Sequence, residues 1–200
     1  MITKDNLRSL LNCLGFVRSE DVIQDVLTLH LTNQETSVSV DFTNEKIIYP
    51  DSIEADRDTT KNFSHNENFV VLECVVGLLL QGYKPEHIVL EPETPGGREN
   101  TNFYCDILIR DNDQRPYMLI ECKTMDGKED DEFSKAWKKT LQDGGQLFNY
   151  YNTYRQAQYL ALYASDFVED EPRCSYRLIT MIDNKEYLES NPSLLSFEKV

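Results

Sequence analysis

The alternation of apolar and polar residues divides the first quarter of the chain into one helix and three short strands. Apolar residues recur at helical spacing over residues 4–13, and Thr3 before them is a suitable N-cap. Strand-like runs, separated by short polar turns, follow at residues 26–31, 36–42 and 46–50. This pattern predicts an antiparallel meander, with a polar loop after it over residues 51–66.

The pattern changes at residues 67–81, which are apolar almost all round and predict a helix buried against a sheet. Later in the chain, two helical stretches are separated by Gly144 and Gly145, where a helix must break. The remaining elements predicted are strands over residues 87–93, 158–165 and 173–183, and helices over residues 132–143, 146–154 and 183–190.

A chain of 200 residues suits one domain with a sizeable core. We expect an α/β protein with a central mixed β-sheet flanked by helices. In this arrangement residues 1–66 supply the N-terminal helix and meander, residues 67–165 the core, and residues 166–200 a C-terminal strand and helix.

The most informative segment is a predicted hairpin of residues 103–110 and 117–123. The polar loop between the two strands, if symmetric, places Asp106 opposite Glu121. Side chains alternate along a strand, so Glu121 and Lys123 share one face. Two carboxylates and an ammonium are costly to bury without a function. The carboxylates are suitable ligands for Mg²⁺, or for Mn²⁺, and Lys123 could orient a water or neutralise developing charge.

Composition limits the class of protein. The chain has no apolar run of membrane-spanning length and no segment resembling a signal peptide. Its five cysteines are scattered, which predicts reduced core residues of a cytoplasmic protein and excludes a zinc or disulfide framework. The net charge of −15 opposes binding to nucleic acid, which depends on neutralising phosphates.

The Asp106 and Glu121-Cys122-Lys123 arrangement resembles the PD-(D/E)xK nuclease signature. Over residues 37–168, and most strongly over 67–165, the chain looks like the N-terminal nuclease domain of type I restriction enzymes. It is also similar to single-chain restriction–modification proteins that carry such a nuclease. This resemblance implies a restriction-endonuclease-like fold and metal-dependent cleavage of DNA phosphodiester bonds. Within it Asp106 and Glu121 are metal ligands, and Lys123 is the catalytic lysine.

Three further residues acquire roles from the same resemblance. Gln146 and Tyr150, four residues apart on one helix face, match its QxxxY motif, although a solvated helix face explains this spacing as well. Glu67 corresponds to a further metal ligand on the first core helix, or is simply a favourable charge at a helix N-terminus. Glu73, ringed by apolar residues, is the second choice for that ligand.

DNA contacts are expected from a lysine face of one helix, formed by Lys135, Lys138 and Lys139, and from Arg98 in a glycine-rich loop. A solvated lysine face is the alternative for the first, and an exposed loop residue for the second. Since the chain is acidic, other domains or subunits of a restriction–modification complex (motor, methylase and specificity parts) are expected to supply most of the affinity for double-stranded DNA.

Two other functions are compatible with the same motifs. A RecB-like repair or recombination exonuclease would share every residue named above. A catalytically silent nuclease fold that docks partner proteins would agree with the acidic composition.

Overall fold

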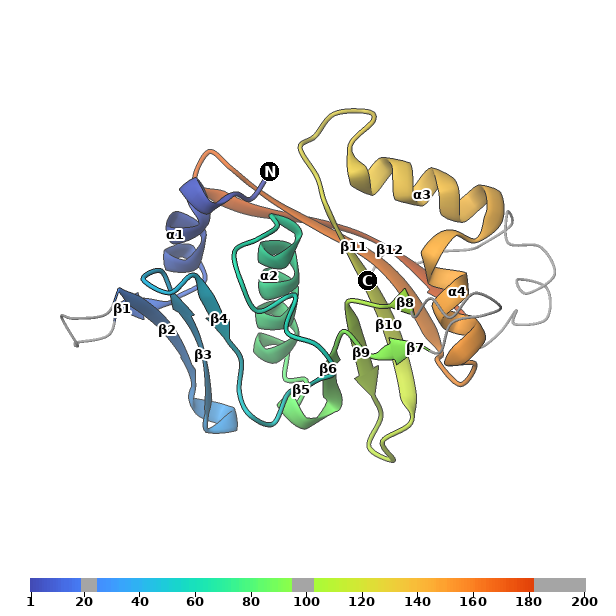
Figure 1. The fold of residues 1–200 in the computed structure, drawn as a ribbon, viewed down its shortest axis with the longest axis horizontal. Helices are drawn as coiled ribbons and strands as arrows, with labels where there is room; N and C mark the ends of the chain where they lie inside the picture. Colours follow the sequence, from blue (N-terminus) through green and yellow to red (C-terminus); the bar gives the residue numbers. More distant parts are fainter. Residues whose placement is uncertain (19–24, 95–102, 182–200) are drawn as a thin grey trace.

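The computed structural model describes residues 1–18, 25–94 and 103–181 (Figure 1). It begins with α1 (Lys4–Cys13), for which Asn6 Oδ1 accepts a hydrogen bond from the Thr3 backbone N–H at 2.8 Å, as expected of an N-terminal cap. A four-stranded antiparallel sheet follows, formed by β1 (Val17–Arg18), β2 (Val26–Leu31), β3 (Thr36–Asp41) and β4 (Lys46–Ile48). The predicted meander is therefore confirmed, and β1 is a strand that the sequence pattern missed.

A six-stranded mixed sheet forms the centre of the molecule, in the order β12-β11-β10-β9-β6-β5. Strands β10 and β11 run parallel, as do β5 and β6, and the other neighbours are antiparallel. The strands are β5 (Glu54–Ala55), β6 (Ile88–Leu90), β9 (Ile107–Arg110), β10 (Pro116–Thr124), β11 (Tyr159–Val168) and β12 (Glu171–Thr180). A separate antiparallel pair is formed by β7 (Glu93–Thr94) and β8 (Phe103–Tyr104).

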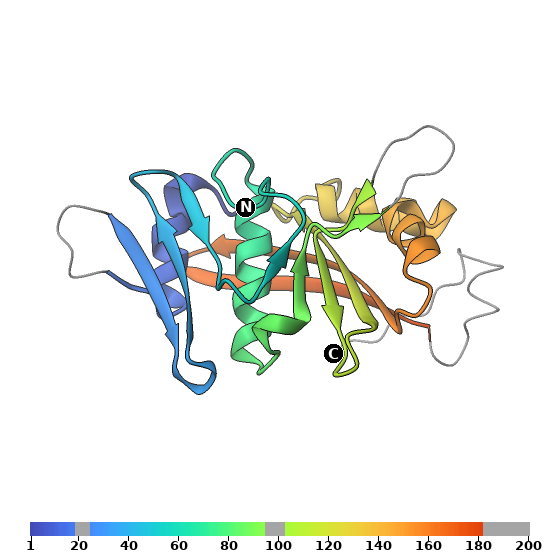
Figure 2. The same cartoon turned by 60° about the horizontal axis from the view of Figure 1, so that its bottom comes forward.

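Helix α2 (Glu67–Leu80) lies between the two sheets (Figures 1 and 2). One continuous apolar core joins it to α1, to the meander and to one face of the central sheet, which contributes Ile107, Ile120 and Cys122. Helices α3 (Glu132–Asp143) and α4 (Gly145–Thr153) cover the other face, where Leu108 and Leu119 meet a second core. The apolar residues all round α2 are explained by burial between two sheets, where the sequence pattern had predicted only one.

The structure corrects several boundaries. The predicted strand 103–110 is interrupted, because β8 ends at Tyr104 and β9 begins at Ile107. The predicted loop 51–66 contains the short strand β5. The expected limit of the core at residue 165 falls inside β11, and the last predicted helix, 183–190, lies outside the described residues.

The cysteines are all free, in agreement with the reduced state expected. Cys74, Cys105 and Cys122 are buried. Cys13 and Cys174 are exposed, so the prediction that all five belong to the core was wrong for these two.

The corner between α3 and α4 depends on glycine. Gly144 ends α3 in the left-handed region, with φ of 82°, and its N–H donates to the carbonyl of Thr140. A methyl group at Gly144 would lie 2.9 Å from Cβ of Phe148. The predicted break at Gly144 and Gly145 is therefore confirmed, and it directs α4 back across the sheet.

Candidate active site

The hairpin of β9 and β10 brings the signature residues together. Leu119 pairs with Leu108 and Ile120 with Ile107, so the same register places Glu121 opposite Asp106, as predicted. The loop between the two strands is not symmetric, however. Pro116 pairs with Arg110, and a bulge between Pro116 and Met118 then shifts the pairing by one residue into the predicted register. Beyond the last pair, Asp106 Oδ2 accepts a hydrogen bond from the Cys122 N–H at 2.6 Å.

Glu121 and Lys123 share the face of β10 that alternation predicts. Glu121 is only 3 % exposed, and its Oε1 accepts a hydrogen bond from Lys123 Nζ at 2.6 Å. Lys123 is also largely buried and lies 3.4 Å from Oε2 of Glu67 at the start of α2. The structure thus brings Asp106, Glu121, Lys123 and Glu67 together at one end of the central sheet.

The charges in this group do not cancel, since three carboxylates surround one ammonium. Burial, and then the neighbouring Glu121 carboxylate, raise the pKa of Asp106 well above its ordinary value. Burial likewise raises the pKa of Glu121, although Lys123 opposes this shift. Burial alone would lower the pKa of Lys123, but the carboxylates of Glu121, Asp106 and Glu67 raise it, so the side chain stays protonated.

One oxygen of the site has no close partner among the residues that the structure describes. Oε2 of Glu121 is buried and accepts no hydrogen bond of ordinary geometry from them, which is costly for a carboxylate, although the Tyr150 hydroxyl is near enough to the Glu121 carboxyl group to lower its pKa. Two carboxylates in close proximity and an unsatisfied carboxylate oxygen fit a hard divalent cation, which binds oxygen ligands. Asp106 and Glu121 would hold such an ion. Among the described residues, however, no group of three or more His, Cys, Asp or Glu side chains is arranged to bind a metal, so water or substrate would have to complete the coordination.

The predicted pair on α4 lies next to this site. Gln146 Nε2 donates to the Tyr150 hydroxyl at 3.3 Å, across one helical turn. Tyr150 is 2 % exposed, and its pKa is raised by burial and by the negative charge of Glu121. The pair therefore links the exposed face of α4 to the buried carboxylate of Glu121.

Glu73 lies elsewhere. Its Oε2 accepts a hydrogen bond from the Tyr163 hydroxyl at 2.5 Å, and burial raises the pKa of the carboxyl group. Tyr163 is paired in the sheet with Cys122, whose side chain faces α2, away from Glu121. Of the two helix carboxylates that the sequence left open, only Glu67 contacts Lys123.

The structure shows the surroundings of three of the four residues that are expected to contact DNA, and the contacts themselves stay a prediction. Lys135 and Lys138 are exposed on α3, but each forms an ion pair, with Glu132 at 3.0 Å and with Asp130 at 2.9 Å. Lys139 is exposed on the same helix. Arg98 lies outside the described residues.

Glu91 is a residue of this region that sequence reasoning missed. It is 5 % exposed, follows β6 with φ of 47°, and its N–H donates to the carbonyl of Asp106 at 2.9 Å. Its carboxylate accepts hydrogen bonds from the backbone N–H groups of Thr59 and Thr60 at 2.9 and 3.2 Å. An acidic residue directly after the apolar run of residues 88–90 was the available signal.

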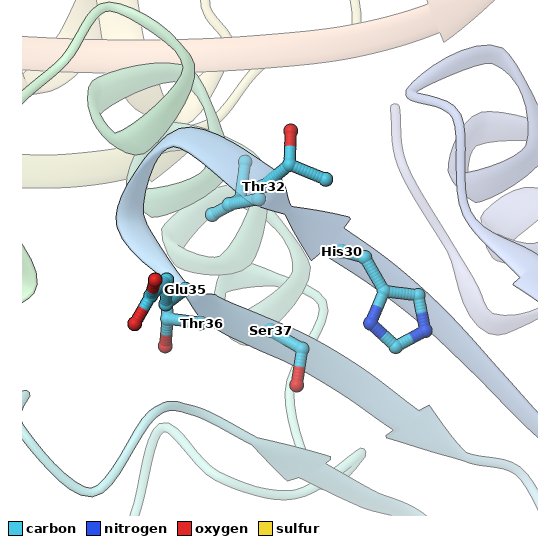
Figure 3. A pocket seen from close by; sticks show the side chains of 6 residues that line it. His30, Thr32, Glu35, Thr36 and Ser37 are labelled. Carbon is cyan, nitrogen blue, oxygen red and sulfur yellow. The ribbon is translucent and has the colours of Figure 1, made fainter.

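A cavity of about 350 Å³ occurs on the turn between β2 and β3 (Figure 3), in the four-stranded sheet and not in the central sheet that carries Asp106. It is lined by His30, Leu31, Thr32, Glu35, Thr36 and Ser37. Most of these side chains are at least partly exposed, and the cavity takes no part in the cluster around Glu121.

No helix in the described ranges is both long enough and apolar enough to span a bilayer. No protein-family model matches this chain, and a search of curated proteins finds no match either.

Proposed function

We propose that this chain is the metal-dependent endonuclease domain of a type I-like restriction–modification system, and that it hydrolyses DNA phosphodiester bonds. The observation that supports this proposal most directly is the environment of Glu121. This carboxylate is buried beside Asp106, it accepts a hydrogen bond from Lys123 through one oxygen, and its other oxygen accepts no hydrogen bond of ordinary geometry within the described part of the chain.

The roles of the residues follow from their positions. Asp106 and Glu121 would hold Mg²⁺ or Mn²⁺, which when bound lowers the pKa of a coordinated water and stabilises charge on the phosphoryl group. Lys123 stays protonated beside these carboxylates, so it serves as a hydrogen-bond donor and a positive charge for the attacking water or the phosphate oxygens. Tyr150, bound to Gln146, packs against Glu121 and limits its movement.

The overall charge bears on the partners of the proposed nuclease. A net charge of −15 disfavours tight binding of DNA by this chain alone. We therefore assign the recognition sequence and most of the affinity to other domains or subunits. The chain contributes the site of hydrolysis.

Cleavage of circular DNA tests the proposal. Supercoiled plasmid and the same plasmid made linear are incubated with the chain, alone and with its partner subunits, in Mg²⁺ or in EDTA. The proposal expects Mg²⁺-dependent nicking of the circular form, which Lys123→Gln abolishes. Degradation confined to linear DNA would instead identify an exonuclease. Absence of any cleavage in the assembled complex would favour a docking module.

A further inference from the structure

A short segment after β5, residues 56–60, lies at the same end of the central sheet as the proposed active site. Figure 2 shows this end, where the loop after β5 lies with the N-terminus of α2 and with β7 and β8. The segment is fixed at its start, because the Asp56 N–H donates to the carbonyl of Leu90 at 3.2 Å. The Asp56 carboxylate also accepts a hydrogen bond from the Glu93 N–H at 2.8 Å.

The other end of the segment is fixed by the buried carboxylate of Glu91. It accepts hydrogen bonds from the backbone N–H groups of Thr59 and Thr60 and from both of their hydroxyl groups. The N–H of Glu91 in turn donates to the carbonyl of Asp106. Through Glu91, residues 56–60 are therefore connected to the backbone of Asp106, a proposed metal ligand.

Arg57 projects from the middle of this fixed segment. It is exposed, and its Cζ lies 4.3 Å from the centre of the Tyr104 ring. Tyr104 is two residues before Asp106, so the ring that holds the guanidinium belongs to the segment that leads into the proposed site. Stacking on the ring restricts the side chain but leaves the N–H groups along the guanidinium edge available to an oxygen acceptor.

The acidic neighbours of Arg57 have other partners. The carboxylate of Asp58 forms an ion pair with Lys61 at 2.8 Å, and that of Asp56 binds the Glu93 N–H. Arg57 itself forms no ion pair with any residue that the structure describes. In this respect it differs from Lys135 and Lys138 on α3, which are both paired with acidic side chains.

We propose that Arg57, oriented by Tyr104, binds a backbone phosphate of the DNA strand that enters the active site. This inference rests on the proposed nuclease function and adds a substrate-contacting residue to it. A planar guanidinium can donate two parallel hydrogen bonds to one phosphate, which a lysine ammonium does not reproduce. The contact is independent of base sequence, because every phosphate presents the same oxygens.

A salt titration of DNA binding tests the inference. Duplex DNA is titrated with the full chain in Ca²⁺, which replaces Mg²⁺ to prevent cleavage, and cleavage rates are measured separately in Mg²⁺. Arg57→Gln is expected to weaken binding about tenfold at low salt, and to reduce the slope of log affinity against log salt by about one. Arg57→Lys and Tyr104→Leu should give intermediate losses of DNA affinity. The first removes the planar guanidinium and the second removes the ring that orients it, and neither changes a proposed metal ligand.

Arg115→Gln is the matched control. It removes the same charge from an exposed arginine in the β9–β10 turn, at the other end of the sheet, where Arg115 pairs with Asp113. If Arg57→Gln and Arg115→Gln bind DNA with equal affinity and equal salt dependence while the wild-type chain cleaves DNA, the assignment of Arg57 is wrong and the nuclease function stands. If the wild-type chain and its complex neither bind nor cleave DNA, both proposals fail.

Discussion

Asp106 Oδ2 accepts a hydrogen bond from the backbone N–H of Cys122 at 2.6 Å, at the point where the ladder between β9 and β10 has ended. The Asp106 carboxylate thus accepts the hydrogen bond that a backbone carbonyl would accept if the ladder between the two strands continued. Because Cys122 separates Glu121 from Lys123, this bond fixes the Asp106 carboxylate beside both of them. The interruption between β8 and β9, which the sequence did not predict, is what frees Asp106 to make it.

The first prediction concerns stability without metal. The raised pKa of Asp106 means that the folded chain binds more protons than the unfolded chain at pH values between the ordinary and the raised pKa. The free energy of unfolding should therefore fall as pH rises through this window. Asp106→Asn can keep the hydrogen bond from Cys122 and removes the titration. In EDTA at neutral pH it should be more stable by about 1 kcal/mol.

Urea unfolding at pH 5 and pH 8 measures this difference, first in EDTA and then in Mg²⁺. Saturating Mg²⁺ should stabilise the wild type more than Asp106→Asn, because only the wild type keeps both carboxylates. A wild-type stability that is constant between the two pH values in EDTA would contradict the account of the charges.

A second prediction separates the two carboxylates of α2. Glu67→Gln removes a charge beside Lys123 and should lower the cleavage rate about tenfold, equivalent to about 1.4 kcal/mol of transition-state stabilisation. Glu73→Gln makes the same substitution on the same helix but keeps an acceptor for the Tyr163 hydroxyl, so cleavage should be retained. Rates of plasmid nicking under identical conditions decide between them, and equal losses would show that Glu67 has no special role.

The corner between α3 and α4 provides a third prediction. Gly144→Ala places a residue with a side chain at φ of 82° and a methyl group against Phe148. We expect a loss of about 1–3 kcal/mol in the free energy of unfolding, together with slower cleavage, because α4 carries Gln146 and Tyr150.

Gly82→Ala is the control for this prediction. Gly82 has a similar φ of 94°, but a methyl group there would meet no atom of the described residues within 4 Å. It should therefore destabilise the fold through backbone strain alone and leave cleavage by the folded protein unchanged. Thermal unfolding and nicking assays of both variants give the comparison.

A fourth prediction concerns the lysine face of α3. Replacing Lys135, Lys138 and Lys139 together with glutamine should weaken DNA binding to all sequences alike and flatten its salt dependence. The ion pairs of Lys135 and Lys138 are exposed and therefore weak, so both side chains can turn to a phosphate. An unchanged salt slope for the triple variant would exclude this face from DNA binding.

The sequence predicted which residues of β9 and β10 lie together more accurately than it predicted the contacts that hold them in place. Asp106, Glu121 and Lys123 could be placed together because strand alternation and hairpin register are local rules. The position of Glu67 beside Lys123 needs α2 to pack across β10, and the choice between Glu67 and Glu73 depends on that packing. The anchoring of Thr59 and Thr60 by Glu91 joins segments about thirty residues apart, which no local pattern specifies.

Metal binding by the isolated chain is the most direct test of the central claim, because it requires neither DNA nor partner subunits. Calorimetric titration with Mn²⁺ would compare the wild type with Asp106→Asn and with Glu73→Gln, which removes one buried carboxylate outside the site. We predict that the wild type and Glu73→Gln bind Mn²⁺ with equal affinity and that Asp106→Asn binds it at least about tenfold more weakly. No binding by the wild type, or equal binding by all three proteins, would contradict the assignment of Asp106 and Glu121 as metal ligands.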